Sequence, residues 1–466
     1  MWRFKDFGSA VAAESDTGAS ITYAQLDKLA SDLKAITGRA LVFQLCTNSV
    51  GSMAGYAAMI NARIVPVMIS ADLDKDLLKR LTDEYKPEYI WLPSDQKASF
   101  TELEEVFSAY DYSLLKTGEQ PHNMFDELAL LLTTSGSTGS FKLVRQSYRN
   151  IEANTESIVE YLKLDNTERP ITTLPMNYTY GLSIINSHLW VGAKILISDK
   201  TLAQREFWQF FKGKEATSFG GVPFTYEILK KLRFFRMDLP SLRYMTQAGG
   251  KLTVELHKEF AEDSFAKGRR FIVMYGQTEA TARMAYLPAE KAIEKCGSMG
   301  IAIPGGRFEL IDINGDVINE PDIVGELVYY GDNVTLGYAE CIADLAKGDE
   351  RHGKLVTGDM AKMDSDRYFY VVGRKKRFLK MFGKRVNLDE IDRLLKGRFD
   401  SIDCASDGVD DSLYLFMTNE SLLESARKYI SEKININLSA IHSVYVESIP
   451  KNDSGKTLYT ELKKLF

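Results

Sequence analysis

Residues 131–150 read LLTTSGSTGSFKLVRQSYRN. The apolar run at residues 128–132 has the length of a buried strand. Hydroxyl-bearing residues and two glycines follow this run, and Lys142 comes soon after them. Ser147 is a residue type that often caps a helix, and apolar residues then recur at helical spacing over residues 151–162. The stretch therefore predicts a strand, a glycine-rich loop and a helix.

The loop has a composition that suits the binding of polyphosphate. Glycines let the backbone approach a ligand and point its N–H groups at it, while hydroxyls and a lysine add hydrogen bonds and charge. A flexible surface linker has a similar composition, but the apolar strand before the loop and the lysine after it favour phosphate. The loop is not a Walker A motif, because GxxxxGK[ST] does not occur in the chain. The residues expected to contact phosphate are Thr134, Ser135, Gly136, Ser137, Thr138, Gly139 and Lys142.

Length and composition indicate an ordinary globular protein with more than one domain. The chain has 466 residues, of which 45% are hydrophobic and 26% are charged. Its net charge of -6 gives no general attraction to nucleic acid. The four cysteines lie too far apart for a zinc motif or a disulfide framework. No apolar run resembles a membrane span or a signal peptide, so we expect a cytoplasmic protein without a membrane span.

The alternation of strand-like and helical runs predicts an α/β fold. Up to about residue 280 the pattern indicates mostly parallel sheets covered by helices. From about residue 300 the runs are short and β-rich, which indicates a small antiparallel barrel or sheet. The last part fits a small α+β domain. We therefore predict a large N-terminal domain over residues 1–373 and a small mobile C-terminal domain over residues 374–466.

The order TSGSTGxxK in the loop strongly resembles the phosphate loop of the acyl-adenylate-forming superfamily. This superfamily includes acyl- and aryl-CoA synthetases, firefly-type luciferases and the adenylation domains of nonribosomal peptide synthetases. The chain departs from the family pattern at Phe141, where proline is usual, and at Tyr148, where histidine is usual; it keeps Asn150. Further motifs of the family follow in the same order over nearly the whole chain.

One of these motifs, YGQTE at residues 275–279, resembles the family's YGxTE. It follows an apolar run predicted to be a strand, and ligands bind at the carboxyl ends of parallel strands. A carboxylate there suits a hydrated Mg²⁺ that also touches phosphate. The resemblance implies that Glu279 holds Mg²⁺, that Thr278 contacts phosphate, and that Tyr275 and Gly276 flank the adenine. The alternative is that Thr278 and Glu279 only cap the next helix.

Two shorter motifs are expected to bind the rest of the nucleotide. Gly249 and Gly250 match the family's GG turn near the adenine, and TGD at residues 357–359 matches the family's TGD. The resemblance implies that Asp359 binds both ribose hydroxyls, and an Asp-stabilised turn is the alternative.

The cation-rich segment GRKKRFLKMFGKRVNLDEI begins at Gly373 and is similar to the family's GRxDxxIKxxGxRVxPxEIE. The resemblance implies that Arg374 reaches the ribose, that Lys375 is a hinge, and that Gly383 faces the thiol substrate. A solvated charged face is the simpler alternative. A nucleic-acid patch is less consistent with the acidic chain and the lack of interleaved aromatic residues.

Lys456, in PKNDSGK, matches the family's PKxxxGK and is the predicted catalytic lysine. A flexible ammonium group can bridge the attacking carboxylate and the α-phosphate while charge develops on both. An inert surface lysine is the alternative at such a position.

The segment PMNYTYGL at residues 175–182 resembles the family's PxFHxxGL and is expected to line the acid pocket. Tyr178 takes the place of an aromatic residue between the acyl and thiol tunnels, and core packing is the alternative. Amino-acid-activating relatives usually have aspartate where this chain has Thr179. An aryl acid or a short-to-medium acyl acid is therefore favoured over an α-amino acid, with Gly250 also beside the acid.

The resemblance implies an AMP-forming acid–thiol ligase that uses ATP and Mg²⁺. It would activate a carboxylic acid to an acyl-adenylate, release pyrophosphate, and transfer the acyl group to CoA or to carrier-protein phosphopantetheine. The small domain would rotate about Lys375 between the two half-reactions, removing Lys456 and presenting Gly383. The alternatives are a free-standing enzyme that loads an acyl carrier protein and a non-catalytic adenylate-binding protein. No nucleic-acid partner is expected.

Overall fold

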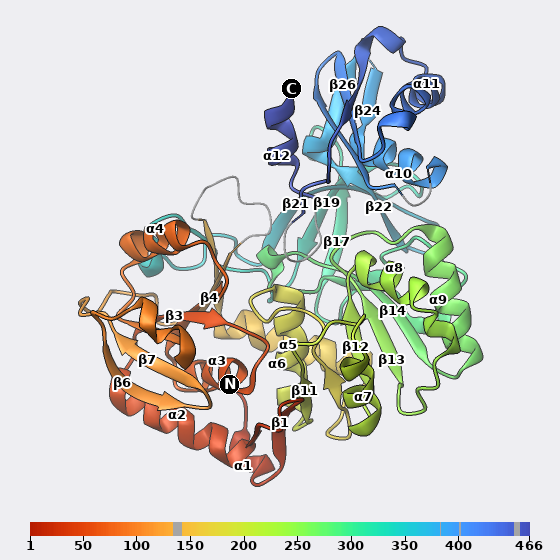
Figure 1. Cartoon of the computed structure of the whole chain (residues 1–466). Helices are drawn as coiled ribbons and strands as arrows, with labels where there is room; N and C mark the ends of the chain where they lie inside the picture. The colour runs from red at the N-terminus through yellow and green to blue at the C-terminus, as the bar shows by residue number, and fades with distance from the viewer. Residues whose placement is uncertain (134–141, 383, 400–401, 452–456) are drawn as a thin grey trace. The chain divides into compact units, whose positions relative to one another are not determined.

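A computed structural model describes the chain except for residues 134–141, 383, 400–401 and 452–456 (Figure 1). The chain forms two compact units. Unit 1 consists of Met1–Cys296, Ala302–Arg307 and Tyr330–Leu355. Unit 2 consists of Gly297–Ile301, Phe308–Tyr329 and Val356–Phe466. Within the described part of the chain, no helix combines the length and apolarity that crossing a membrane requires.

The first sheet of unit 1 has eight strands. Strands β3, β4, β5 and β8 run parallel, and the other four strands add antiparallel pairs at both edges. In sheet order the strands are β20 (Gly337–Ala339), β9 (Leu143–Ser147), β8 (Leu128–Thr133), β4 (Val65–Ser70), β3 (Leu41–Cys46), β5 (Tyr89–Pro93), β7 (Tyr112–Lys116) and β6 (Glu104–Ala109).

The second sheet of unit 1 has nine strands, and the six from β14 to β1 in sheet order run parallel. In sheet order its strands are β16 (Ile301–Ala302), β15 (Ala285–Tyr286), β14 (Arg270–Tyr275), β13 (Tyr244–Gln247), β12 (Ser218–Gly221), β10 (Pro170–Ile171), β11 (Ile195–Ile197), β1 (Val11–Ser15) and β2 (Ser20–Thr22).

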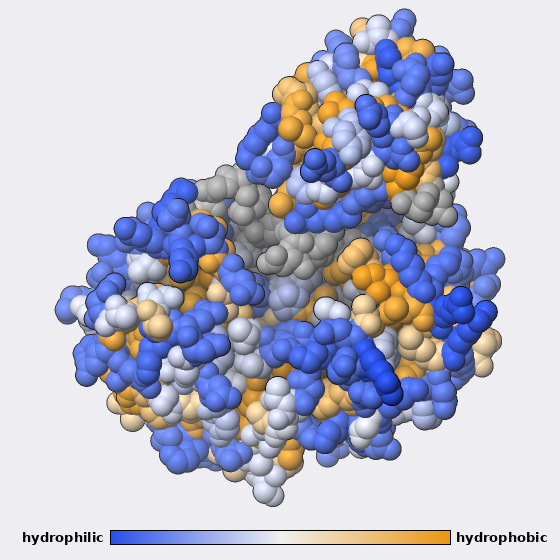
Figure 2. Space-filling model, in the orientation of Figure 1, coloured by the Kyte–Doolittle hydropathy of each residue, from blue (hydrophilic) through white to orange (hydrophobic). Residues whose placement is uncertain are grey.

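Helices cover these sheets and fill the space between them. The helices of unit 1 are α1 (Phe4–Phe7), α2 (Tyr23–Thr37), α3 (Val50–Asn61), α4 (Lys75–Tyr85), α5 (Tyr148–Leu162), α6 (Thr179–Trp190), α7 (Arg205–Gly213), α8 (Pro223–Lys231) and α9 (Val254–Ala266). Both α3 and α6 are buried nearly all round, because they share one core with strands of both sheets. The face shown in Figure 2 is largely hydrophilic, with a small apolar area around α8, where Phe224 is 49% exposed.

Unit 2 holds most of a five-stranded sheet together with the C-terminal α+β part. The five strands are β18 (Val317–Ile318), β17 (Arg307–Ile311), β19 (Gly325–Tyr330), β21 (Lys354–Met363) and β22 (Phe369–Arg374). The C-terminal elements are β23 (Phe378–Met381), β24 (Lys384–Asn387), α10 (Leu388–Arg398), β25 (Cys404–Val409), β26 (Ser412–Met417), α11 (Leu423–Ile434), β27 (Ile441–Tyr445) and α12 (Tyr459–Leu462). The predicted domain boundary between residues 373 and 374 and the hinge at Lys375 stay predictions.

The stretch around the glycine-rich loop differs in one respect from its prediction. The predicted strand is β8, and α5 begins after Ser147, whose hydroxyl accepts a hydrogen bond from the Asn150 backbone N–H at 3.1 Å. The structure adds a strand, β9, between Lys142 and Ser147, and it pairs antiparallel with β8. The sequence gives no signal for β9, because two of its five buried positions hold Arg145 and Gln146.

Arg145 in β9 joins the sheet edge to the segment at residues 336–350. Its fully buried side chain donates hydrogen bonds to the carbonyl oxygens of Leu336, Tyr338 and Gly348, at 3.3, 3.1 and 3.2 Å. The guanidinium group also forms an ion pair with Glu350, which is 47% exposed. These bonds and the ion pair join β9 to the segment at residues 336–350.

Replacing Arg145 with methionine should lower the free energy of unfolding by about 3 kcal/mol, because a buried side chain loses its ion pair and the hydrogen bonds that join β9 to residues 336–350. Urea-induced unfolding measures this change. The control is Arg149→Met, since Arg149 is 59% exposed and pairs with Asp332 at 2.6 Å, and its effect should stay below about 0.5 kcal/mol. Equal losses for the two variants would contradict the role of Arg145.

Candidate functional site

The loop after β14 turns sharply at Gly276 and returns against its own start. A Cβ atom on Gly276 would lie 1.7 Å from the carbonyl oxygen of Ala282 and 2.9 Å from the Cα of Arg283, so no other residue fits. The Met284 N–H then donates to the Tyr275 carbonyl oxygen at 2.8 Å. The closed loop lies at the carboxyl end of a parallel strand, where α/β sheets bind ligands.

Glu279 in this loop is held by both its backbone and its side chain. Its carbonyl oxygen accepts hydrogen bonds from the N–H and the hydroxyl of Thr335, at 3.1 and 2.9 Å, and from Arg351 at 2.9 Å. Its Oε1 accepts a hydrogen bond from the Tyr338 hydroxyl at 2.8 Å. Burial, and then the Glu279 charge, raise the pKa of Tyr338 to about 12, so the phenol is a neutral donor. Oε2 of Glu279 accepts no hydrogen bond from any described residue, which leaves it available to a cation.

The Thr278–Ala280 segment is a single 3-10 turn without a side-chain cap, so a capping role for Thr278 and Glu279 is not what the structure shows. The Thr278 carbonyl oxygen accepts from the Thr281 N–H at 3.1 Å. At the start of the loop, the Tyr275 hydroxyl accepts a hydrogen bond from the Gln277 side chain at 3.2 Å.

Lys142 and Glu279 contact the same aromatic ring. The Lys142 Nζ lies 3.9 Å from the centre of the Tyr338 ring and 3.1 Å from Oε1 of Glu340. The Arg351 guanidinium carbon lies 4.6 Å from the centre of that ring. The structure therefore brings the lysine after the glycine-rich loop and the predicted metal carboxylate into one cluster of unit 1. Residues 134–139 of the loop lie outside the described residues.

Asn150, where this chain keeps the asparagine of the family pattern, binds the backbone of the segment that leads to Thr335 and Tyr338. Its side-chain NH₂ donates to the carbonyl oxygens of Asp332 and Val334 at 2.7 and 2.8 Å. Tyr148, the departure from the family's histidine, is buried, and the Arg63 guanidinium carbon lies 4.4 Å from the centre of its ring. Both side chains therefore have structural contacts, and Phe141 lies outside the described residues.

The structure places Tyr178 and Gly249, which belong to two different motifs, next to each other. A Cβ on Gly249, whose φ is +82°, would lie 2.6 Å from the Tyr178 hydroxyl. Gly250 lies beside them, and its carbonyl oxygen accepts from the Gln247 side chain at 2.8 Å. Burial raises the pKa of Tyr178 to about 12. Thr179 begins α6 and donates its hydroxyl to the carbonyl oxygen of Thr281, so this hydroxyl anchors the Glu279 loop.

Asp359 and Arg374 pair directly within unit 2. Their strands β21 and β22 set them opposite each other, and Oδ1 of Asp359 lies 2.6 Å from Nε of Arg374. Asp359 is 2% exposed and stands inside β21, so it is not the turn residue of the alternative reading. Its N–H donates to the Thr357 hydroxyl at 3.1 Å. A buried carboxylate beside a more exposed arginine can accept hydrogen bonds from a diol.

Three cations of the cation-rich segment, Arg374, Lys375 and Arg377, form ion pairs within unit 2. Lys375 lies 2.6 Å from Glu326, and Arg377 pairs with both Asp389 and Asp392, the latter at 2.8 Å. These pairs favour a structural role over a nucleic-acid patch. Gly383 and Lys456, the predicted thiol-side and catalytic residues, lie outside the described residues.

Sequence reasoning assigned no role to the three residues that hold Glu279, which are Thr335, Tyr338 and Arg351. They lie 56 to 72 residues further along the chain. The described residues contain no group of three or more His, Cys, Asp or Glu side chains that could hold a metal ion. A single carboxylate fits Mg²⁺ that arrives with phosphate, because this ion keeps several waters and takes few protein ligands.

Comparison with known proteins gives consistent matches. Residues 2–339 match the family described as AMP-binding enzyme. An oxalate–CoA ligase of Arabidopsis thaliana is 27% identical over 358 residues, which cover 74% of this chain and 68% of that protein. The match covers 64% of the length of a probable CoA ligase of Humulus lupulus and 64% of the length of a peroxisomal OPC-8:0-CoA ligase of Arabidopsis thaliana. The chain therefore spans about two thirds of the length of these relatives.

Solved structures share the fold over nearly the whole chain. O-succinylbenzoate coenzyme A synthetase of Bacillus subtilis in complex with AMP has a TM-score of 0.80 at 20% identity, covering 99% of this chain and 97% of that one. The same enzyme in complex with ATP and magnesium has a TM-score of 0.79 at 19% identity, covering 99% and 98%. These likenesses confirm the predicted α/β fold with its antiparallel part and its small C-terminal part.

Replacing Gly276 with alanine should destabilise the protein by about 3 kcal/mol, because the new methyl group overlaps the Ala282 carbonyl. Chemical denaturation followed by tryptophan fluorescence measures the change. Gly213→Ala is the control, since a Cβ at the end of α7 meets nothing within 4 Å, and it should be neutral or stabilising by up to about 1 kcal/mol. A Gly276→Ala protein as stable as the wild type would show that the loop is not tightly closed.

Proposed function

The chain belongs to the AMP-binding enzyme family of the acyl-adenylate-forming superfamily and is an acid–CoA ligase-type enzyme; from this premise we propose its reaction. A carboxylate oxygen of an organic acid attacks the α-phosphorus of ATP, the bond to the bridging oxygen of pyrophosphate breaks, and an acyl-adenylate forms. A thiol then attacks the acyl carbon and AMP leaves. The thiol is that of CoA, and carrier-protein phosphopantetheine is the alternative acceptor.

The observation that carries the proposal is the cluster around Glu279. Its Oε2, to which no described residue donates, lies in the loop after β14, and the Lys142 ammonium contacts the same Tyr338 ring where β9 begins, next to the glycine-rich loop. We assign Mg²⁺ binding to Glu279 and phosphate binding to Lys142, Thr278 and the loop residues. When bound, Mg²⁺ neutralises charge on the phosphate oxygens. The neutral Tyr338 hydroxyl fixes the carboxylate by one oxygen and leaves the other for the ion.

The acid and the adenine are assigned to the neighbouring Tyr178 and Gly249 region. Gly249, Gly250, Tyr275 and Gly276 offer backbone that a flat base can approach closely. The acid lies beside Tyr178, on the side of the α6 N-terminus, whose positive end favours the reacting carboxylate. Because Thr179 bonds the Glu279 loop, the acid site and the metal site share one support.

Unit 2 supplies the remaining assignments. We assign Asp359 to accept hydrogen bonds from the ribose hydroxyls. Arg374, whose Nε lies 2.6 Å from Oδ1 of Asp359, is assigned to the same ribose. Lys456 is assigned to the adenylation step, Lys375 to the hinge, and Gly383 to the thiol side. Binding energy and charge neutralisation then account for most of the catalysis, as in phosphoryl transfer generally.

The direct test is acid-dependent release of pyrophosphate from Mg·ATP, measured over a broad set of carboxylic acids, first alone and then with CoA or holo carrier protein. We expect release with a subset of acids and thioester formation with CoA. Thioester formation only with the carrier protein would select the carrier-loading alternative. ATP binding in calorimetry without turnover of any acid would instead indicate a non-catalytic adenylate-binding protein.

Lys456→Ala should lower acid-dependent pyrophosphate exchange by at least about 100-fold, because the ammonium that bridges carboxylate and α-phosphate is lost. Thioester formation from chemically prepared acyl-adenylate should change by less than about threefold. Lys464→Ala is the control, since Lys464 is 67% exposed and pairs with Glu461 in the same C-terminal segment. An equal loss of rate in pyrophosphate exchange and in thioester formation would contradict the assignment of Lys456 to the adenylation step.

A further inference from the structure

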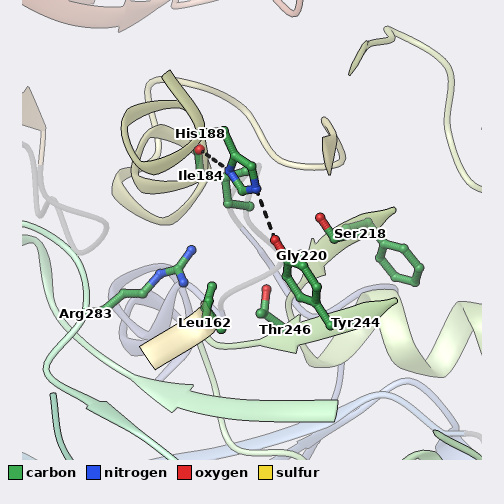
Figure 3. A pocket seen from close by; sticks show the side chains of 9 residues that line it. Leu162, Ile184, His188, Ser218, Gly220, Tyr244, Thr246 and Arg283 are labelled. Carbon is green, nitrogen blue, oxygen red and sulfur yellow. Dashed lines mark hydrogen bonds between the residues drawn. The ribbon is translucent and has the colours of Figure 1, made fainter. Parts of the chain in front are cut away.

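A small cavity lies deep in unit 1, between α6 and the strands β12 and β13 (Figure 3). Its walls include Ile184 and His188 of α6, Ser218 of β12, Tyr244 and Thr246 of β13, and Arg283. Its free volume of about 10 Å³ holds about one water molecule. The cavity is thus large enough for one small polar group.

Arg283 brings a positive charge to this cavity. It is 3% exposed and follows Glu279 by four positions in the same loop. Its Nε donates to the Ser183 hydroxyl at 3.1 Å, and its Nη1 donates to the Tyr161 hydroxyl at 3.0 Å and contacts the Met274 sulfur at 3.3 Å. These partners are all neutral, and Nη2 has no hydrogen-bond partner among the described residues.

No acidic side chain among the described residues pairs with Arg283. The other buried arginine of unit 1 described above, Arg145, has Glu350 as its counter-ion. Burying a cation against neutral groups is costly unless an anion or water completes its surroundings. Arg283 therefore leaves an uncompensated positive charge at the wall of a cavity that has room for a small group.

The other polar groups of the cavity are neutral. His188 lies 2.7 Å from the Ile184 carbonyl oxygen through Nδ1 and 3.0 Å from the Tyr244 hydroxyl through Nε2. The Nδ1–H therefore donates to the carbonyl, and Nε2 accepts from the tyrosine. Burial lowers the pKa of His188 to about 4, so the ring is uncharged at neutral pH. In Figure 3 the Arg283 guanidinium and the Ser218 hydroxyl lie on different sides of the space.

One aromatic ring separates this cavity from the region assigned to the reacting end of the acid. The Tyr178 ring, beside Gly249, lies 6.3 Å from the Tyr180 ring in an edge-on contact. Tyr180 in turn lies 2.7 Å from the Thr246 hydroxyl, which lines the cavity. The Arg283 guanidinium carbon lies 5.3 Å from the centre of the Tyr180 ring. An acid that passes Tyr180 would thus place its far end against Arg283.

We propose that the cavity binds a second anionic group of the substrate, and that the enzyme activates a short dicarboxylic acid. The inference rests on the proposed function, because it assigns the far end of the acid in the same site. The distal carboxylate places one oxygen in this volume of about one water molecule, accepts a hydrogen bond from Nη2 of Arg283 and supplies the missing counter-charge. Guanidinium matches carboxylate geometry, and the small free volume limits the acid to a short chain.

The first test compares wild-type rates of pyrophosphate release with straight-chain diacids, from malonate to adipate, and with the monoamide of each. The two members of a pair differ at the distal end only by the charge. The best diacid should have a kcat/KM at least about 100-fold higher than its monoamide. A monoamide used as well as its diacid would overturn the anion site and leave adenylation standing.

The second test alters the cation itself. Arg283→Gln should bring the kcat/KM values of the diacid and its monoamide to within about threefold of each other, while Arg283→Lys keeps part of the preference. Arg169→Gln is the control, because Arg169 pairs with the exposed Glu215 at 2.7 Å, and it should keep the wild-type ratio. A purely structural Arg283 would lower both rates together and leave their ratio unchanged, which would overturn the proposal.

Calorimetry separates this proposal from that of adenylation, and it does not depend on a folded Arg283 variant. Wild-type protein saturated with a non-hydrolysable ATP analogue and Mg²⁺ is titrated with the diacid and with its monoamide. Tighter binding of the diacid by at least about tenfold supports the anion site even if pyrophosphate release fails. Binding of neither compound, together with no turnover of any acid, would overturn both proposals.

Discussion

The close contact between Gly276 and the Ala282 backbone determines the geometry on which the rest of the site depends. It folds the loop after β14 back on itself, so that Glu279 and Arg283 belong to one closed loop. The loop's carbonyl oxygens are then satisfied by distant side chains: Thr335 and Arg351 at Glu279, Thr179 at Thr281, and Asn154 and Asn333 at Arg283. A loop without a regular ladder has to satisfy its backbone in this way.

The donors to this loop are themselves fixed by the fold. Tyr338 lies in β20, which pairs with β9 and is secured by the buried side chain of Arg145. The same pairing places β9, which follows Lys142, next to the strand that carries Tyr338. Lys142 and Glu279, which are far apart in sequence, therefore meet at one phenol ring. The stability of an edge strand thus controls the position of both charged groups.

Local patterns in the sequence were enough for much of the fold and for part of the site. Apolar runs and the Ser147 cap correctly predicted β8, β14 and α5, and the roles assigned by motif to Glu279, Tyr178 and Gly249 stay predictions. The strand β12 was missed because SFGG carries no apolar pattern, and its burial comes only from its neighbours. The roles of Tyr338 and Arg283 were not predicted for the same kind of reason, since these roles come from partners in other elements. Such long-range contacts leave no periodic signal in a single sequence.

Selection by an uncompensated charge works differently from selection by the shape of a pocket. A neutral acid end of similar size could enter the space beside Arg283, but it would displace water from a buried guanidinium without replacing its hydrogen bonds and counter-charge. Every ligand that lacks the anion would therefore bind with a less favourable free energy. Buried polar groups reject analogues of the right shape in the same way. Because Arg283 and Glu279 share one closed loop, an anion at the far end of the acid would also rest on the structure that positions the metal carboxylate.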